Sequence, residues 1–314
     1  MQPLLRYLSL RQLTVFLEAA RQMSFARAAE ALHLTQPAIS MQIRQLEEAV
    51  GLPLFERVGK KLSLTQAGQM LRHHAARALG ELQDAEQALS ALKGLRSGRA
   101  TVGLVSTAKY FAPRLLARFA GRHPQVDIRF FVGNREILIH ALRDNEIDFA
   151  VMGRPPETLE TVSQAIAENP HRLVAHKEHR LAKARRFDFH ELREETFLLR
   201  EPGSGTRLVM EAMFKQHLFS PGKTVMLGSN ETVKQAVMAG LGVSLLSLHS
   251  LELELRAREI ALLDVDGTPV LRNWHIVHMN AKTLPPAAAA FRAFLCAQTQ
   301  PHLDKTFARW GRGG

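Results

Sequence analysis

The stretch from residue 24 to residue 47 carries polar side chains at a spacing that suits recognition of a groove. Gln36, Ser40 and Arg44 recur at every fourth position and therefore share one face of a predicted helix. Amide, hydroxyl and guanidinium groups are the ones that hydrogen-bond to base edges in the major groove of DNA. Apolar residues fill the opposite face, so the segment has one side for a core and one for a partner. We therefore expect this segment to read duplex DNA.

The elements that must position these side chains are two short helices with a tight break between them. Thr35 is placed to cap the second helix, and Pro37 is tolerated in its first turn. Ala28 and Ala29 allow the two helices to cross closely, as a helix-turn-helix requires. An ordinary helical hairpin in a core is the alternative for this stretch considered alone.

A basic hairpin is predicted after the second helix. Residues 54–64 alternate in polarity around Gly59, which fits two strands whose cations face phosphates, although a simple surface hairpin fits as well. Together with the helix pair this hairpin predicts a winged helix-turn-helix. The expected DNA-contacting residues are Ser24, Gln36, Pro37, Ala38, Ser40, Met41, Arg44, Gln45, Arg57, Lys60 and Lys61.

Small polar side chains follow four predicted strands later in the chain. In open α/β sheets, ligands bind beyond the carboxyl ends of strands, where helix N-termini offer N–H groups to anions. Arg135 and Arg154 can add paired hydrogen bonds to such an anion. Each hydroxyl or amide alone would serve equally well as a helix cap. The expected ligand-binding residues are Ser106, Thr107, Gly133, Asn134, Arg135, Arg154, Ser204, Gly205, Thr206, Asn230 and Glu231.

The sequence contains no motif for catalysis or for a cofactor. The glycine-rich segment 201–207 matches neither a phosphate loop nor a dinucleotide fingerprint. His171, His176 and His179 have a loosely metal-like spacing, but we predict that they lie in a surface loop. Cys296 is predicted to be buried and inert in the last helix. We expect no catalytic residue, no metal and no cofactor. An enzyme or metabolite receptor with an appended DNA-binding domain is the alternative.

The charge and cysteine content restrict the class of protein. The net charge is +11, but residues 1–92 hold 10 Lys/Arg against 8 Asp/Glu, so most of the excess lies downstream. A basic downstream region fits an anionic ligand, although a solvated basic surface explains it as well. The single cysteine excludes an intramolecular disulfide and fits the cytoplasm. No apolar run is long enough to span a membrane, and the N-terminus does not resemble a signal peptide.

A long helix is predicted between two domains. Residues 1–64 form the DNA-binding domain, residues 65–92 the helix and residues 93–99 a glycine-containing hinge. The apolar positions of the helix repeat every seven residues, which favours a partner helix and predicts a dimer. A single helix that lies on its own domain is the alternative. The expected dimerisation residues are Leu71, Ala75, Ala78, Leu82, Ala85 and Leu89.

Strands and helices alternate from residue 100 onward, which predicts parallel sheets covered by helices. We expect residues 100–314 to form two α/β lobes. Lobe I takes in about 100–162 and 268–300, and lobe II about 163–267. The last helix is predicted to end at Thr299, with a frayed tail after Pro301.

Residues 10–70 resemble the DNA-binding domain of LysR-type transcriptional regulators. The resemblance rests on the motifs S-F-A-R-A-A, T-Q-P-A-I-S, G-L-P-L-F-E-R and L-T-Q-A-G. The segments GLVSTAKYFAPRLL, FVGNRE and DFAVMGRPP are similar to the CbbR subgroup, which controls Calvin-cycle (RuBisCO) operons. Met41 departs from the family, where arginine or another polar residue is common, so apolar contact with a thymine methyl is expected there.

The resemblance implies a fold, a function and partners. It implies a winged helix-turn-helix and a dimerisation helix, followed by a two-lobe effector domain like that of periplasmic binding proteins. The expected function is ligand-responsive transcription regulation of a carbon-fixation operon. The expected partners are double-stranded promoter DNA, RNA polymerase, further copies of the chain in a dimer of dimers, and a small anionic metabolite. That metabolite would be a phosphorylated sugar, phosphoenolpyruvate or an NADPH-like molecule.

Overall fold

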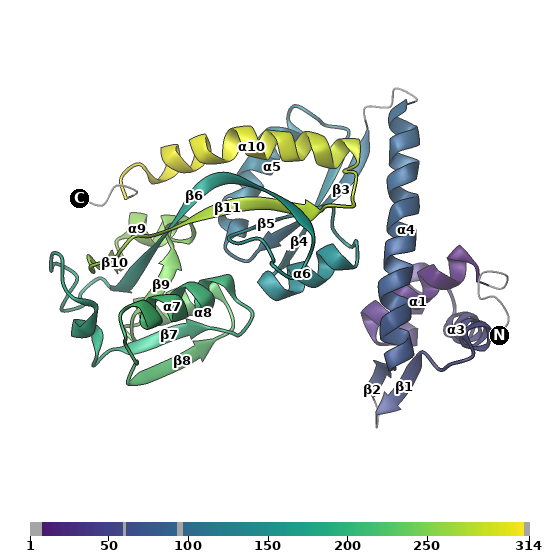
Figure 1. The fold of residues 1–314 in the computed structure, drawn as a ribbon, viewed down its shortest axis with the longest axis horizontal. Helices are drawn as coiled ribbons and strands as arrows, with labels where there is room; N and C mark the ends of the chain where they lie inside the picture. Colours follow the sequence, from purple (N-terminus) through teal and green to yellow (C-terminus); the bar gives the residue numbers. More distant parts are fainter. Residues whose placement is uncertain (1–7, 59–60, 93–96, 311–314) are drawn as a thin grey trace. The chain divides into compact units, whose positions relative to one another are not determined.

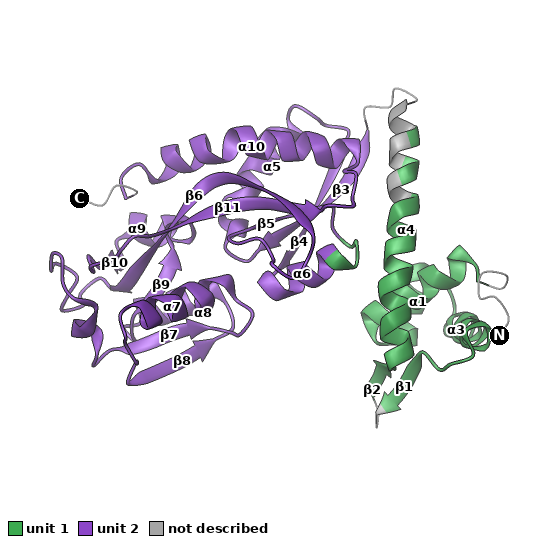
Figure 2. Cartoon of the chain, viewed as in Figure 1, with its two compact units in different colours: residues 1–90, 143–146 green, residues 91–142, 147–314 purple. Residues whose placement is uncertain are grey.

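The computed structural model describes residues 8–58, 61–92 and 97–310, and the chain divides into two compact units. The first unit holds residues 1–90 with 143–146, and the second holds residues 91–142 with 147–314 (Figure 2). The first is mainly helical and the second is α/β, which confirms the predicted fold class. Of the predicted hinge 93–99, residues 93–96 lie outside the described residues, and Gly98 and Arg99 already belong to a strand, β3 (Gly98–Val105), which corrects the end of the predicted hinge.

Three short helices form the body of the first unit: α1 (Leu10–Gln22), α2 (Phe25–Leu32) and α3 (Gln36–Val50) (Figure 1). Side-chain caps begin all three of them, and at α1 the Ser9 hydroxyl accepts from the backbone N–H of Gln12. The Ser24 hydroxyl accepts a hydrogen bond from the backbone N–H of Arg27, and the Thr35 hydroxyl accepts one from Ala38. Gly51 ends α3 in the left-handed region, at φ 74°. Thr35 and Gly51 therefore define α3 at the two ends that the sequence predicts.

The core of this unit lies where α1, α2 and α3 meet. Ala28, Ile39 and Leu46 are fully buried in it, so the small residue of α2 does permit a close helix crossing. The predicted hairpin is the antiparallel pair β1 (Phe55–Val58) and β2 (Lys61–Leu64). A Cβ at Gly68 would lie 2.1 Å from the carbonyl oxygen of Leu54, so only glycine fits there.

The two halves of the long helix α4 (Gln66–Leu92) differ in burial. Ala75 is buried in the core of the DNA-binding unit, and Leu71 packs against the same core. This packing corrects the expectation that Leu71 and Ala75 face a partner helix, because their own domain already covers them. Ala78 and Ala85 are exposed, and Leu82 and Leu89 are 50% and 61% exposed.

The second unit is built around a sheet with the strand order β10-β6-β11-β5-β3-β4, which β9 joins by pairing with β6. Its parallel part forms lobe I. The strands of lobe I are β3 (Gly98–Val105), β4 (Val126–Gly133) and β5 (Phe149–Met152), and its helices are α5 (Ala112–Ala120) and α6 (Arg135–Arg143). A short 3-10 helix, η2 (Ala108–Tyr110), follows β3.

Lobe II repeats the alternation of strands and helices. Its elements are η3 (Phe189–Leu192), β7 (Thr196–Arg200), α7 (Gly205–Gln216), β8 (Lys223–Leu227), α8 (Asn230–Met238), β9 (Ser244–Ser247), η4 (Leu248–Ser250), α9 (Glu252–Ala257) and β10 (Ile260–Leu262). β7 and β8 pair in parallel. A separate apolar core fills this lobe around Phe197, Phe214 and Leu245.

Two long antiparallel strands, β6 (Thr161–His176) and β11 (Val270–Met279), connect the lobes. β11 pairs with β5 in lobe I, and the last part of β6 pairs with β9 and β10 in lobe II. Figure 1 shows this ribbon passing from one lobe to the other. The sequence reading did not predict β6.

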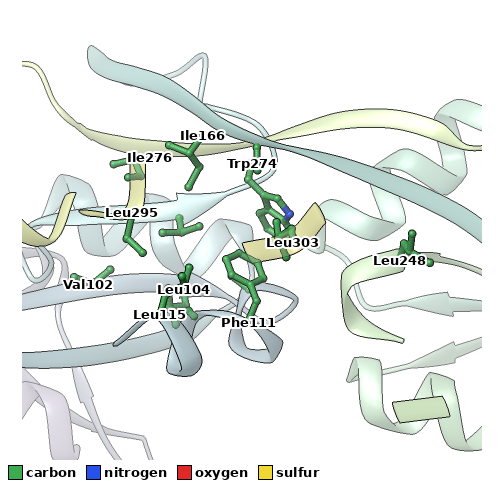
Figure 3. Packing of buried hydrophobic residues seen from close by; sticks show 14 of the residues in the cluster. Val102, Leu104, Phe111, Leu115, Ile166, Leu248, Trp274, Ile276, Leu295 and Leu303 are labelled. Atoms are coloured by element: carbon green, nitrogen blue, oxygen red, sulfur yellow. The ribbon is translucent and has the colours of Figure 1, made fainter. Parts of the chain in front are cut away.

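The largest apolar core lies between the main sheet and the helices that cover it. Figure 3 shows Trp274 of β11 beside Phe111 and Leu303, and the Phe111 and Trp274 ring centroids are 5.2 Å apart. Leu303 comes from α10 (Pro286–Phe307), which packs along β6. Residues from both ends of the unit therefore enclose the indole.

Three sequence predictions are wrong in this unit. The last helix does not end at Thr299: α10 passes through Pro301, and Leu303 and Phe307 are buried, so the predicted frayed tail is helical to Phe307. His171 and His176 lie in β6 rather than in a surface loop, and His171 is 4% exposed. Cys296 is half-buried, and its thiol lies 3.4 Å from the Gln164 amide oxygen. Among the described residues, none of the helices is both long and apolar enough to cross a membrane.

Candidate functional site

The outer face of α3 carries the side chains that the sequence assigns to DNA. Gln36, Met41, Arg44 and Gln45 are exposed, whereas Ile39 is fully buried on the opposite side. Pro37 is exposed too, and Ala38 and Ser40 are half-buried on the same helix. Ser24 is half-buried and caps α2, which places its hydroxyl at a helix N-terminus. Polar groups thus cover a helix face that has no role in the core.

A groove of about 590 Å³ lies between α3 and the hairpin. Met41 and Arg44 line one side of it, and Arg57 lies on the other. The Glu47 carboxylate fixes this geometry by accepting hydrogen bonds from the backbone N–H groups of Leu54 (2.8 Å) and Phe55 (3.1 Å). Arg57 and Lys61 are exposed, in keeping with contacts to phosphates, and Lys60 lies outside the described residues.

A cavity of about 520 Å³ lies between the two lobes of the second unit. This volume is within the range of pockets that hold small metabolites. Eight of the expected ligand-binding residues line it: Ser106, Thr107, Asn134, Arg135, Arg154, Ser204, Gly205 and Thr206. They come from strand ends in lobe I and from the N-terminus of α7 in lobe II, so the two lobes share the cavity.

The charged side chains that line this cavity are all cationic. Arg135, Arg154 and Arg272 are among its lining residues, which are all described, and none of these is Asp or Glu. Burial and the neighbouring Arg154 lower the pKa of Arg135, and Nε of Arg135 is buried with no hydrogen-bond partner among the residues that the structure describes. Nη2 of Arg135 donates to the carbonyl of Pro155 at 3.2 Å. An anion would relieve the repulsion between the arginines and satisfy the free N–H.

The start of α7 contributes the hydroxyl-bearing residues Ser204 and Thr206 to the lining of the same cavity. Ser204 is 3% exposed and Thr206 is 8% exposed, and Ser204 does not cap its helix with its side chain. The first N–H groups of a helix lack intrahelical acceptors and favour negative charge. Gly203, at φ 82°, approaches lobe I so closely that a Cβ would lie 2.6 Å from a carboxylate oxygen of Glu136. The turn before α7 therefore lies directly against the other lobe.

Three of the expected ligand-binding residues do not line the cavity. Gly133 packs against Ile137, where an added Cβ would lie at 2.8 Å. The Asn230 side chain is 1% exposed and accepts a hydrogen bond from Arg200. Glu231 accepts a hydrogen bond from the Tyr110 hydroxyl at 2.5 Å. The structure thus places Gly133, Asn230 and Glu231 in packing and lobe–lobe contacts.

The sequence reading missed the contribution of the β6–β11 ribbon to the cavity. The ribbon adds Asn169, His171, Leu271, Arg272, Asn273, Trp274 and His275 to the lining. The register of β11 shifts between Trp274 and His275, so these adjacent residues can both reach the cavity. Burial lowers the pKa of His275, which favours its neutral form. Turn motifs identify strand ends, but no local motif marks the middle of a long strand as cavity wall.

Two family models match successive parts of the chain. The family model for the bacterial regulatory helix-turn-helix protein, lysR family, matches residues 10–69. The model for the LysR substrate binding domain matches residues 93–300. The chain is 58% identical to the HTH-type transcriptional regulator CfxR of Cupriavidus necator, over 98% of this chain and 97% of that protein. It is 46% identical to a RuBisCO operon transcriptional regulator of Allochromatium vinosum, over 93% and 97%.

A solved structure matches the second unit. The Synechocystis PCC6803 CcmR regulatory domain in complex with 2-PG is 35% identical and superimposes with a TM-score of 0.62. That match covers 64% of this chain and 97% of the CcmR domain. The named relatives are transcriptional regulators, and the alternative of an enzyme is therefore set aside. The chain belongs to the LysR family of bacterial transcriptional regulators.

Proposed function

We propose that this regulator controls a Calvin-cycle (RuBisCO) operon and responds to a small phosphorylated carboxylate bound between its two lobes. It works in the cytoplasm as a homo-oligomer, a dimer of dimers, on double-stranded promoter DNA, where it contacts RNA polymerase. The operon follows from relatives named as RuBisCO operon regulators. The type of effector follows from the cavity.

The observation that carries the effector proposal is the cationic lining. A cavity with Arg135, Arg154 and Arg272 and with no carboxylate among its lining residues favours an anion over a neutral or cationic molecule. The 2-PG of the CcmR complex is 2-phosphoglycolate, which carries a phosphate and a carboxylate. Two anionic ends suit a cavity with arginines on one side and a helix N-terminus on the other.

Ligand binding between lobes provides a route to regulation. Because the lining comes from both lobes, a ligand that contacts both binds most tightly in one relative pose of the lobes. Such a ligand shifts the population toward that pose by its difference in affinity for the two. We propose that this shift alters DNA binding by the oligomer, which makes the effector allosteric in the thermodynamic sense.

Calorimetric titration of the full chain tests this proposal. We expect 2-phosphoglycolate or phosphoenolpyruvate to bind, and glycolate, which lacks the phosphate, to bind at least about tenfold more weakly, because charge-assisted hydrogen bonds are lost. NADPH and ribulose 1,5-bisphosphate are titrated in the same way. The same ligands are then added to the protein bound to a DNA fragment from a RuBisCO promoter. Equal affinity for the phosphorylated and unphosphorylated compounds would contradict an anion-selective cavity.

A further inference from the structure

Arg200 is a buried arginine at the last position of β7. Its side chain is 3% exposed and forms paired hydrogen bonds with Glu201, at 2.7 Å from Nε to Oε2 and 2.9 Å from Nη2 to Oε1. Nη1 donates to the Asn230 side-chain oxygen at the start of α8. Nη2 also donates to Oγ of Ser106, at 3.3 Å. These bonds fix the plane of the guanidinium in the interior of the unit.

The bond to Ser106 connects the two lobes at the wall of the cavity. Ser106 follows β3 in lobe I and lines the cavity, whereas Arg200 belongs to lobe II and is not among the lining residues. The backbone N–H of Ser106 is already fixed, because it donates to the Gly133 carbonyl at 3.0 Å. Arg200 therefore acts on the one part of Ser106 that is still free to rotate, its hydroxyl.

Because the Ser106 hydroxyl accepts a hydrogen bond from Arg200, it is left to act as a hydrogen-bond donor. A serine hydroxyl has one proton to donate and two lone pairs that accept. Because one lone pair accepts from the guanidinium, the proton points elsewhere, and no acceptor for it is found in the part of the chain that the structure describes. A hydroxyl that accepts from a cation is also polarised and becomes a stronger donor. Ser106 is thus prepared to donate to a ligand in the cavity.

Backbone carbonyls of Arg200 and Glu201 also hold the start of α7, which forms the opposite wall. The carbonyl of Glu201 accepts from the backbone N–H of Ser204 at 3.2 Å, and Ser204 lines the cavity at the start of α7. The Arg200 carbonyl accepts from Nη1 of Arg207 in α7 at 3.1 Å. The Arg200 side chain therefore reaches the lobe I wall, and its backbone is joined to α7, although Arg200 does not itself line the cavity.

We propose that Arg200 is a positioning residue for the cavity: it holds Ser106 as a hydrogen-bond donor toward an anionic ligand. This inference rests on the proposed function, because it requires an anion between the lobes. Arg200 does not touch the ligand, and its contribution to affinity passes through Ser106.

A double-mutant cycle on the full chain tests this coupling, with 2-phosphoglycolate as the probe and calorimetry as the readout. We expect Ser106→Ala and Arg200→Gln each to weaken binding about tenfold, the loss of one charge-assisted hydrogen bond. The double variant should bind no more than about twofold more weakly than either single variant, because both changes remove the same bond. If Arg200 acted independently of Ser106, the two tenfold losses of affinity would multiply, and the double variant would bind roughly a hundredfold more weakly than the wild type. That result would overturn the proposal.

A second variant keeps the test valid if Arg200→Gln does not fold, which its melting temperature will show. Arg200→Lys keeps the positive charge beside Glu201, but one ammonium cannot reproduce the planar fork that reaches both Glu201 and Ser106. We expect it to lose affinity as Ser106→Ala does, and wild-type affinity would overturn the proposal. The matched control is Arg114→Gln, which breaks a 2.6 Å bond to Glu252 across the lobes without touching a cavity residue. Its affinity should not change.

One further comparison separates this inference from the proposed function. If Arg135→Ala weakens binding but Ser106→Ala does not, the anion site stands and only the role of Arg200 is wrong. If the wild-type protein does not bind the probe, or if Arg135→Ala binds it as tightly as the wild type, the proposed effector cavity fails and the inference fails with it.

Discussion

The indole N–H of Trp274 donates a hydrogen bond to Nδ1 of His249 at 3.0 Å, and both side chains are buried. Trp274 lines the ligand cavity, and His249 lies in η4 of lobe II, so this bond connects the cavity wall to the second lobe. The Nδ1 atom can accept only while the imidazole is neutral. Burial, with smaller effects of the nearby histidines, lowers the pKa of His249 to about 3, and burial lowers that of His171 to about 4.

The first prediction is a loss of stability in mild acid. Both pKa values lie below the ordinary value of about 6.5, so between pH 6.5 and 4 the unfolded chain binds protons that the folded chain does not. Stability therefore falls as the pH drops below about 6.5, by about 2 kcal/mol for each histidine at about pH 5. Urea denaturation followed by tryptophan fluorescence at pH 7.5 and 5 measures this difference.

A matched pair of variants tests the assignment. His249→Gln keeps an acceptor for the indole but does not titrate, so the loss of stability between the two pH values should become smaller by about 2 kcal/mol. His140→Gln removes an exposed histidine of α6 and should leave the pH dependence unchanged. Equal stability of the wild-type protein at the two pH values would show that His171 and His249 are protonated at little cost.

The second prediction concerns DNA reading by α3. Gln36→Ala removes an exposed amide from the first position of the helix and should cost about 1–3 kcal/mol at particular base pairs. Lys61→Ala removes an exposed cation from β2 and should weaken binding to all sequences, with a salt slope smaller by about one. Binding to promoter and random fragments over a series of salt concentrations measures both effects. Equal weakening of the two fragments by Gln36→Ala would show that Gln36 does not read bases.

The third prediction places the contact between chains on the outer half of α4. Leu82 and Leu89 are exposed, seven residues apart on a helix whose inner half is covered by its own domain. Leu82→Asp introduces a charge that a helix pair cannot pair or hydrate, so dimerisation and promoter binding should fail together. Glu81→Gln, at the adjacent exposed position, is the control and should sediment as the wild type does. An unchanged mass for Leu82→Asp would place the interface elsewhere.

Local motifs predicted the DNA-binding unit better than the second unit. The helix pair depends on helix caps and on a close helix crossing, and these features require particular residue types that can be recognised in the sequence. Thr35, for example, begins α3, and Gly51 ends it. Strand β6 left no such pattern, because its surroundings change along its length. Gln164 lies at the exposed start of the strand and His171 is buried between the lobes, so polar and apolar residues do not alternate.

The cavity was predictable only in part, for the same reason. Ser106 and Ser204 stand at strand ends and helix starts, where a general rule places ligands. Asn230 stands at a comparable helix start, yet it bonds to Arg200, because the side chain at the end of the neighbouring strand is long and charged. Only the packing of the two lobes decides between these outcomes. The continuation of α10 beyond Pro301 depends likewise on tertiary contacts of Leu303 and Phe307.

The last prediction ranks three cavity residues by the binding free energy that is lost when each is replaced. Arg135 has a buried Nε without a partner, so Arg135→Ala should weaken 2-phosphoglycolate binding by about 1.5–3 kcal/mol, roughly ten- to a hundredfold. The Arg154 side chain is 63% exposed and pairs with Glu157, so Arg154→Ala should cost only about 0–1 kcal/mol. Thr107→Val removes one hydroxyl at a site 8% exposed and should cost about 1 kcal/mol.

Calorimetry on the full chain measures the three losses, and Arg129→Ala is the control. Arg129 is an exposed cation of lobe I that pairs with Asp127 and does not line the cavity. The Arg129→Ala substitution removes the same charge as Arg135→Ala. Any difference in ligand affinity between the two variants therefore reflects the position of the charge and not the net charge. DNA affinity without ligand should be the same in all four variants, since none alters α3 or the hairpin. A loss for Arg129→Ala as large as that for Arg135→Ala would mean that the anion responds to the overall positive field, and that it does not sit against Arg135.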